Sequence, residues 1–108
     1  MAAFKEIDST TLQALLSSSR AILLVDVRSD DEVARGIIHD AVHIPLHLLP
    51  LQAQNLEGDI PLIFYCHSGI RSAQACSYMA QLGRKNLFNL RGGVLGWGAA
   101  GLVLEPKK

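Results

Sequence analysis

Short apolar segments alternate along the chain with segments whose apolar residues recur at helical spacing. The apolar runs at Ala21–Val27 and Ile60–Tyr65 are nearly unbroken, which is typical of strands covered on both faces of a sheet. Phe4–Ile7 and Ala41–Ile44 alternate apolar and polar residues, which predicts shorter strands, the first of them at a sheet edge. Further short strands are predicted at Leu87–Leu90 and Leu102–Leu104.

Helical segments separate these predicted strands. Asp8–Ser9 provides an N-cap before leucines that fall on one helical face. Ser29 followed three residues later by Glu32 is the pattern of a capping box, and it predicts a short helix that ends at Gly36. The longest predicted helix covers Arg71–Leu82, and shorter helical pieces are predicted over Leu46–Asn55 and around Trp97.

Strands and helices that alternate with short connections favour a parallel sheet with helices on both faces. The 108 residues are enough to bury one hydrophobic core and too few for two. We therefore predict one α/β domain over residues 1–108, with a short loose tail from Glu105 onward. In such a sheet, ligands bind beyond the carboxyl ends of the strands.

Composition and charge exclude several classes of protein. Hydrophobic residues make up 49% of the chain and charged residues 19%, which argues against intrinsic disorder. Ten basic residues balance ten acidic ones, so the basic excess of a nucleic-acid-binding protein is missing. No apolar run approaches the roughly 18 residues of a membrane span, Met1–Asp8 is not a signal peptide, and two cysteines do not make a disulfide framework. We expect a cytoplasmic monomer with reduced thiols that binds neither nucleic acid nor membrane.

The segment from Cys66 to Arg71 has the features of a thiolate site. Cys66 follows the predicted strand Ile60–Tyr65 and faces the crevice at its carboxyl end. The next residues lead into a helix N-terminus, so their N–H groups can converge on an anion and lower the pKa of the thiol. Gly69 permits the positive φ that such a loop needs, while Arg71 adds a permanent cation and His67 a weaker one. The spacing alone does not establish catalysis, because cysteine is often just a small buried residue.

Four segments of the chain follow one another as they do in a known family. They are Leu24–Arg28 followed by Glu32, Ala41–Leu46, Tyr65–Ala73, and Asn89–Val94 with Trp97. On these segments the sequence resembles a single-domain rhodanese of the rhodanese-like sulfurtransferase superfamily. The resemblance implies a central parallel sheet of about five strands flanked by helices.

The resemblance also implies a mechanism. Cys66 is the expected nucleophile: its thiolate attacks a sulfane sulfur, as in thiosulfate, and sulfite leaves. The Cys66 persulfide then gives its outer sulfur to cyanide or to a thiol. A small-molecule donor and acceptor are expected, with a protein as a further candidate acceptor, and no cofactor or metal. The backbone N–H groups expected to cradle the sulfur belong to His67, Ser68, Gly69, Ile70, Arg71 and Ser72.

The sequence departs from the family pattern at two places. His67 stands where the family often has arginine, which weakens the positive charge around the site near neutral pH. The usual Gly-His-Ile-Pro-Gly-Ala stretch is Gly36–Ala41 here, without the histidine after Gly36 and without Pro-Gly, which leaves the geometry of that turn open.

Two other functions are weighed against a free-standing enzyme. The small chain and His67 motivate a sulfur-carrier module, which takes sulfur from one partner protein, passes it to another, and turns over little free thiosulfate. A phosphatase is disfavoured, because its loop needs an arginine one position later, where this chain has Ser72.

Other residues near the predicted site are interpreted as structural. Asp26 and Arg28 end a central strand and border the site, and the family resemblance favours an ion pair of Arg28 with Glu32. Cys76 and Trp97 are expected to be buried packing residues.

Three histidines, His39, His43 and His47, recur every four residues, a spacing that would align metal ligands on a helix. Pro45 and the strand-like alternation before it argue against a continuous helix there. We therefore expect turn and strand histidines and no metal site.

Overall fold

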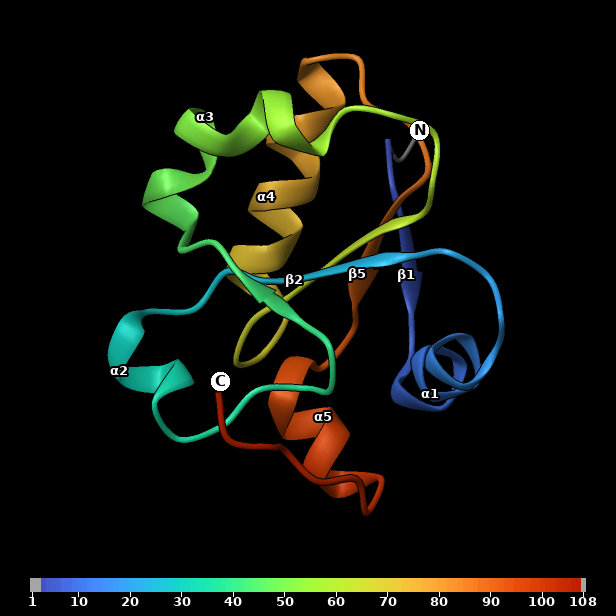
Figure 1. The fold of residues 1–108 in the computed structure, drawn as a ribbon, viewed down its shortest axis with the longest axis vertical. Helices are drawn as coiled ribbons and strands as arrows, with labels where there is room; N and C mark the ends of the chain where they lie inside the picture. Colours follow the sequence, from blue (N-terminus) through green and yellow to red (C-terminus); the bar gives the residue numbers. More distant parts are fainter. Residues whose placement is uncertain (1–2, 108) are drawn as a thin grey trace.

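A parallel sheet of five strands forms the centre of the computed structural model, which describes residues 3–107 (Figure 1). Its order is β1-β5-β4-β2-β3, and every neighbouring pair is parallel. β4 is therefore the central strand, in agreement with its unbroken apolar sequence. The strands are β1 (Lys5–Ile7), β2 (Leu23–Asp26), β3 (Val42–His43), β4 (Leu62–Tyr65) and β5 (Leu87–Leu90).

Helices cover both faces of this sheet, which confirms the predicted α/β architecture. The helices are α1 (Ser9–Ser17), α2 (Asp30–Val33), α3 (Leu49–Gln52), α4 (Ile70–Gln81) and α5 (Gly93–Ala99), with 3₁₀ turns η1 (Leu46–Leu48) and η2 (Ala53–Leu56) flanking α3. α3 and α4 pack on one face, and α1 and α5 on the other (Figure 1). No helix within residues 3–107 combines the length and the apolar composition that crossing a membrane requires.

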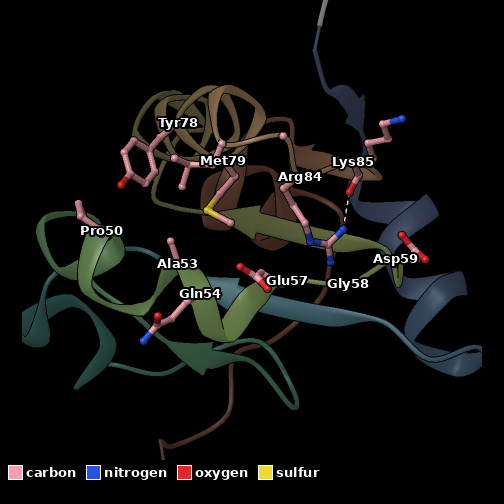
Figure 2. Close-up of a pocket in the computed structure, with 12 residues that line it drawn as sticks. Pro50, Ala53, Gln54, Glu57, Gly58, Asp59, Tyr78, Met79, Arg84 and Lys85 are labelled. Atoms are coloured by element: carbon pink, nitrogen blue, oxygen red, sulfur yellow. Dashed lines mark hydrogen bonds between the residues drawn. The ribbon is translucent and has the colours of Figure 1, made fainter.

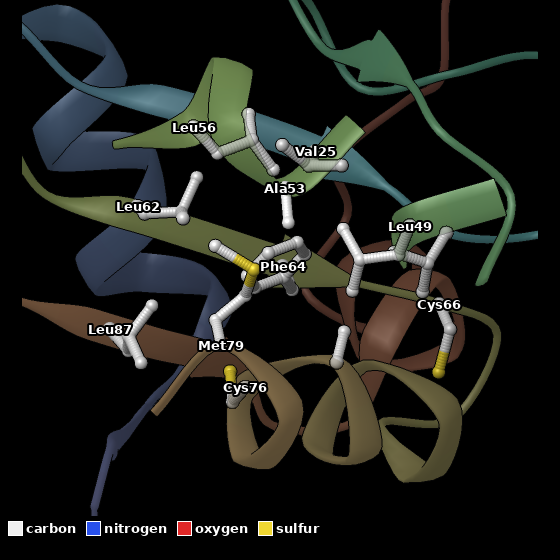
Figure 3. Packing of buried hydrophobic residues seen from close by; sticks show 12 residues of the cluster. Val25, Leu49, Ala53, Leu56, Leu62, Phe64, Cys66, Cys76, Met79 and Leu87 are labelled. Atoms are coloured by element: carbon white, nitrogen blue, oxygen red, sulfur yellow. The ribbon is translucent and has the colours of Figure 1, made fainter. Parts of the chain in front are cut away.

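Alternate residues of β4 enter two separate hydrophobic clusters. Leu62 and Phe64 pack with residues of α3, η2 and α4, whereas Ile63 and Tyr65 pack with residues of α1 and α5. All four side chains are fully buried, and each such burial stabilises the fold by about 1.5–3 kcal/mol. This double coverage fixes β4 in place, and with it Cys66, which belongs to the first cluster (Figure 3).

Two helix starts form as the sequence predicts. At α1, the Asp8 carboxylate accepts a hydrogen bond from the Thr11 N–H at 2.8 Å. At α2, Ser29 Oγ accepts from the Glu32 N–H at 3.3 Å, and the Glu32 carboxylate accepts from the Ser29 N–H at 3.0 Å. The capping box is therefore complete, and it fixes the position of the Glu32 carboxylate.

The strand predicted at Leu102–Leu104 does not form. Leu102 and Leu104 pack instead against the cluster beneath α1 and α5, and the Val103 carbonyl accepts a hydrogen bond from the Trp97 indole at 2.9 Å. An apolar run of three residues does not reveal whether it will pair with a strand or pack on a helix.

The prediction of a loose tail from Glu105 onward is wrong at Glu105 itself. Its backbone makes two hydrogen bonds of 2.7 Å with Ile37, as an isolated antiparallel bridge. Its carboxylate lies 2.7 Å from the His39 ring. The chain is therefore attached to the body of the fold as far as Glu105.

The turn after α2 contains an aspartate in an unusual backbone conformation. Asp40 occupies the position at which the family pattern has glycine, and its φ is +64°. Glycine adopts this left-handed region without steric cost, whereas other residues adopt it with strain that aspartate tolerates better than most. The chain therefore makes the turn at the expected position, with some strain at Asp40.

Replacing Asp40 by glycine should raise the free energy of unfolding by about 0.5–1 kcal/mol, measured by urea denaturation. The relief of left-handed strain exceeds the cost of the more flexible unfolded chain. Asp31→Gly is the matched control: Asp31 is exposed within α2, so glycine there should lower stability. A stability equal to or below wild type for Asp40→Gly would refute the assigned strain.

Candidate active site

The loop between β4 and α4 places Cys66 at the carboxyl end of the central strand. Cys66 follows directly after Tyr65, and α4 begins at Ile70. The Cys66 side chain is 1% exposed, and Figure 3 shows its sulfur well apart from that of Cys76. The cysteine therefore lies at the edge of the sheet where ligands bind in α/β folds.

Three hydrogen-bond donors surround the Cys66 sulfur. The Gly69 N–H lies 3.1 Å from Sγ, and the N–H and hydroxyl groups of Ser72 each lie 3.4 Å from it. Burial alone raises the pKa of the thiol, but donation from the Ser72 hydroxyl and from the N–H groups of Ser72, Gly69 and Ser68 outweighs it. The pKa of Cys66 therefore lies below its ordinary value, which favours a nucleophilic thiolate.

The start of α5 orients the peptide groups of this loop. The Val94 N–H donates to the Cys66 carbonyl at 2.9 Å, and the Leu95 N–H donates to the His67 carbonyl at 3.1 Å. A trans peptide directs its N–H opposite to its carbonyl. Because the His67 carbonyl points to α5, the Ser68 N–H is directed to the opposite side, where it contributes to lowering the pKa of the sulfur.

The close approach of α5 to the loop requires glycine at position 93. Gly93 has a φ of +55°, and a Cβ there would lie 2.5 Å from the His67 carbonyl oxygen and closer still to that of Cys66. Real Cβ atoms do not approach this closely, so any side chain at this position would displace the loop. The predicted Gly92–Gly93 turn therefore serves the site as well as the chain path.

Asn89 on β5 holds the other side of the loop, a role that the sequence analysis missed. Its side-chain N–H group donates to the Gly69 carbonyl at 3.1 Å and to the Glu6 carboxylate at 3.0 and 3.1 Å. Asn89 is 2% exposed. The available signal was a polar amide within the otherwise apolar strand Leu87–Leu90.

Arg71 is paired with a carboxylate. Its guanidinium donates to the two oxygens of Glu32 at 2.6 and 2.8 Å. This hydrogen bonding lowers the pKa of Glu32 to about 2 and raises that of Arg71, so the pair is ionised at neutral pH. The sequence predicted Arg71 as a cation facing the anion, whereas in the structure its charge is compensated by Glu32.

Comparison with known proteins identifies the family of this chain. Residues 8–100 match the family described as "Rhodanese-like domain". The chain belongs to the rhodanese-like family. It is 43% identical over 103 residues to a protein named "Sulfurtransferase" from Allochromatium vinosum, covering 94% of this chain and 96% of that one. The crystal structure of a rhodanese-like domain protein from Staphylococcus aureus matches with a TM-score of 0.87 at 32% identity, covering 97% of this chain and 100% of that one.

A more distant rhodanese-like relative carries a substrate in its name. The chain is 29% identical over 84 residues to the thiosulfate sulfurtransferase GlpE of Coxiella burnetii, covering 78% of each protein. The predicted family and its five-stranded parallel sheet are therefore confirmed, and the named relatives are sulfurtransferases.

In this rhodanese-like fold the partner predicted for Arg28 is wrong. Arg28 donates to the Asp26 carboxylate, with the shortest contact at 2.7 Å, and to the Gly36 carbonyl at 2.7 Å. Its guanidinium carbon also lies 5.7 Å from the centre of the Tyr65 ring. Asp26 and Arg28 are two residues apart in extended chain, so their side chains lie on the same side and pair locally. Both are buried, in agreement with a structural role.

Cys76 and Trp97 are buried, as predicted. The Cys76 thiol lies 3.4 Å from the Phe88 carbonyl, and burial raises its pKa to about 12. It is therefore protonated at neutral pH and unreactive.

Two of the three spaced histidines have separate hydrogen-bond partners. His39 lies beside Glu105, and His43 Nε2 is 2.7 Å from the Arg28 carbonyl. Within residues 3–107, no group of three or more His, Cys, Asp or Glu residues has a metal-binding arrangement.

A large groove lies away from Cys66. It has a volume of about 760 Å³ and lies between η2 and the C-terminal end of α4, beside the segments that precede β4 and β5 (Figure 2). Arg84 lines it, and its guanidinium donates to the carbonyls of Leu56, Ile60 and Lys85. The groove is at the edge of the sheet opposite to the cysteine loop.

Replacing Ser72 by alanine should slow alkylation of Cys66 by iodoacetamide at pH 7 by roughly three- to tenfold, because the thiolate loses its hydroxyl donor and the pKa of Cys66 rises. The pH dependence of the alkylation rate measures this. Ser77→Ala, an exposed change on the same helix, is the control and should react like wild type. An unchanged pH profile for Ser72→Ala would contradict the assigned donor.

Replacing Gly93 by alanine should lower the free energy of unfolding by about 2 kcal/mol or more, since the new methyl group collides with two backbone carbonyls. Gly98→Ala is the control, because Gly98 lies in the same helix with open space around its Cα and should gain slightly from alanine. Urea denaturation of both variants provides the comparison. If the two variants were equally stable, the loop would accommodate the added methyl group without loss of folding free energy, and the required role of Gly93 would be contradicted.

Proposed function

We propose that this chain transfers sulfane sulfur from thiosulfate or a related donor to cyanide or a thiol, through a persulfide on Cys66. The observation that carries this proposal is the Cys66 sulfur, buried at the end of β4 and bound by donors from Gly69 and Ser72. A buried thiol with a lowered pKa has the properties of a covalent nucleophile.

In the first proposed step, the Cys66 thiolate attacks the outer sulfur of the donor. A new S–S bond forms, the S–S bond of thiosulfate breaks, and its electron pair leaves with sulfite. In the second step, cyanide attacks the outer sulfur of the persulfide, thiocyanate leaves, and the Cys66 thiolate returns with the bonding pair. Charge and atoms balance in both steps, and neither uses a cofactor.

The hydrogen-bond donors around the thiolate also suit the persulfide. Each step begins and ends with one negative charge on sulfur within the loop, so fixed N–H dipoles serve both states without rearrangement. The acceptor and donor are proposed to be small molecules, and the protein to act as a cytoplasmic monomer. Thiosulfate as the donor is supported by the name of the GlpE relative.

A second candidate is a carrier module that exchanges sulfur with partner proteins. It is favoured by the compensation of Arg71 by Glu32, which leaves the loop without a free arginine for a dianionic donor. Two exposed apolar side chains also border the loop: Ile70 is 69% exposed and Leu95 is 55% exposed. A partner protein could bury these two side chains, whereas a free anion would gain no binding energy from contact with them.

Incubation of wild-type protein with thiosulfate should add about 32 Da, detected by intact-protein mass spectrometry and reversed by cyanide. Cys66→Ala should gain no mass, while Cys76→Ser, the matched control on the buried second thiol, should gain it normally. Steady turnover with thiosulfate and cyanide would favour the enzyme. A persulfide that forms from a hydropersulfide and not from thiosulfate would favour the carrier, and no adduct from either donor would refute both.

A further inference from the structure

We propose that Glu32 sets the charge preference of this site: by compensating Arg71, it makes the site use neutral or singly charged sulfur donors more readily than dianions such as thiosulfate. Glu32 acts through Arg71 and is therefore a positioning residue that determines specificity. The identity of the natural donor rests on the proposed sulfur transfer, whereas the charge effect itself is measurable without any sulfur transfer.

The Glu32 carboxylate is held from two sides. One oxygen, Oε1, accepts from Arg71 at 2.6 Å and from the N–H and hydroxyl groups of Ser29 at 3.0 and 3.1 Å. The other, Oε2, accepts from Arg71 at 2.8 Å. Because the capping box of α2 fixes the carboxylate, the carboxylate in turn fixes the guanidinium of Arg71 in a bidentate pair.

One member of this pair, Arg71, lies in the first turn of α4, next to the cysteine loop. Arg71 is the residue immediately before Ser72, whose N–H and hydroxyl groups donate to Cys66 Sγ. The Arg71 and Glu32 side chains are 37% and 26% exposed, so both are reachable by a solvent-borne ligand. A donor that approaches Cys66 therefore meets a guanidinium whose charge is already neutralised.

Within residues 3–107, no charged group donates a hydrogen bond to the Cys66 sulfur. The donors to Sγ are neutral N–H and hydroxyl groups of Gly69 and Ser72. Arg28, the second arginine that borders the site, is bound to the buried carboxylate of Asp26. Charge on the sulfur is therefore stabilised by dipoles, which suit one negative charge better than the two of thiosulfate.

The size of the effect follows from simple electrostatics. A single uncompensated charge about 6 Å away in water changes the affinity for a monoanion by roughly threefold and for a dianion by roughly tenfold. Removing the Glu32 charge should therefore improve dianion use selectively. Glutamine also satisfies a capping box, so Glu32→Gln removes the charge and keeps the helix start.

The first test measures charge preference without any sulfur transfer. Cys66 is alkylated with iodoacetate, an anion, and with iodoacetamide, its neutral analogue, and the ratio of the two rate constants cancels the thiolate fraction. We expect this ratio to rise about threefold in Glu32→Gln and to fall about threefold in Arg71→Gln, where Glu32 is left uncompensated. Peptide mass spectrometry confirms that Cys66 is the residue modified.

Two controls separate the pair from a general change in charge. The double variant Glu32→Gln/Arg71→Gln should return the ratio close to wild type, because both charges are gone. Asp31→Asn removes an exposed carboxylate from the same helix and should change the ratio less than Glu32→Gln. An unchanged ratio in Glu32→Gln and Arg71→Gln, or an equal rise in Asp31→Asn, would overturn the proposal.

The second test compares two sulfur donors by the rate of persulfide formation on Cys66. With thiosulfate, Glu32→Gln should lower KM about tenfold with little change in kcat, whereas 2-hydroxyethyl hydropersulfide should respond threefold or less. If alkylation responds and neither donor loads Cys66, the charge effect stands and the proposed function fails. If both donors load Cys66 but Glu32→Gln changes neither the iodoacetate-to-iodoacetamide ratio nor the relative use of the two donors, the proposed function stands. The role of Glu32 is then refuted.

Discussion

The contact between the start of α5 and the cysteine loop is the constraint on which the site depends. The N–H groups of Val94 and Leu95 bind the carbonyls of Cys66 and His67, so the loop presents its N–H groups on the other side. Carbonyl and N–H directions within a planar peptide are not independent. The contact therefore orients the His67 and Ser68 N–H groups, and Gly93 allows α5 to come close enough to make it.

The site stabilises negative charge on sulfur with oriented dipoles. Cys66 is 1% exposed, and an ion in such a place without partners would be costly. Gly69 and Ser72 supply hydrogen bonds that require no rearrangement in the proposed conversion of the thiolate to a persulfide. The neighbouring arginines, Arg28 and Arg71, are each paired with a carboxylate, so they shape the loop and its surroundings more than they add net charge.

Features encoded by neighbouring residues were predictable from the sequence. The apolar run before Cys66 predicted the central strand because a strand covered on both faces needs no polar side, and the Ser29–Glu32 spacing predicted a capping box that requires nothing beyond four residues. The family segments added the five-stranded sheet, which the structure confirms. The strand predicted at Leu102–Leu104 was wrong, because the surface on which a short apolar run packs is not specified by the run itself.

Contacts across the fold were not predictable in the same way, and the two arginines show why this matters. The family resemblance favoured an ion pair of Arg28 with Glu32, which would have left Arg71 without that carboxylate. In the structure Arg28 pairs with Asp26, two residues away in extended chain, and Glu32 pairs with Arg71, which is 39 residues away in the sequence. With Glu32 paired to Arg28 instead, the positive charge of Arg71 beside the cysteine loop would not be compensated by Glu32. Partner choice, decided by tertiary packing, therefore sets the charge of the site even though its residues were all visible in the sequence.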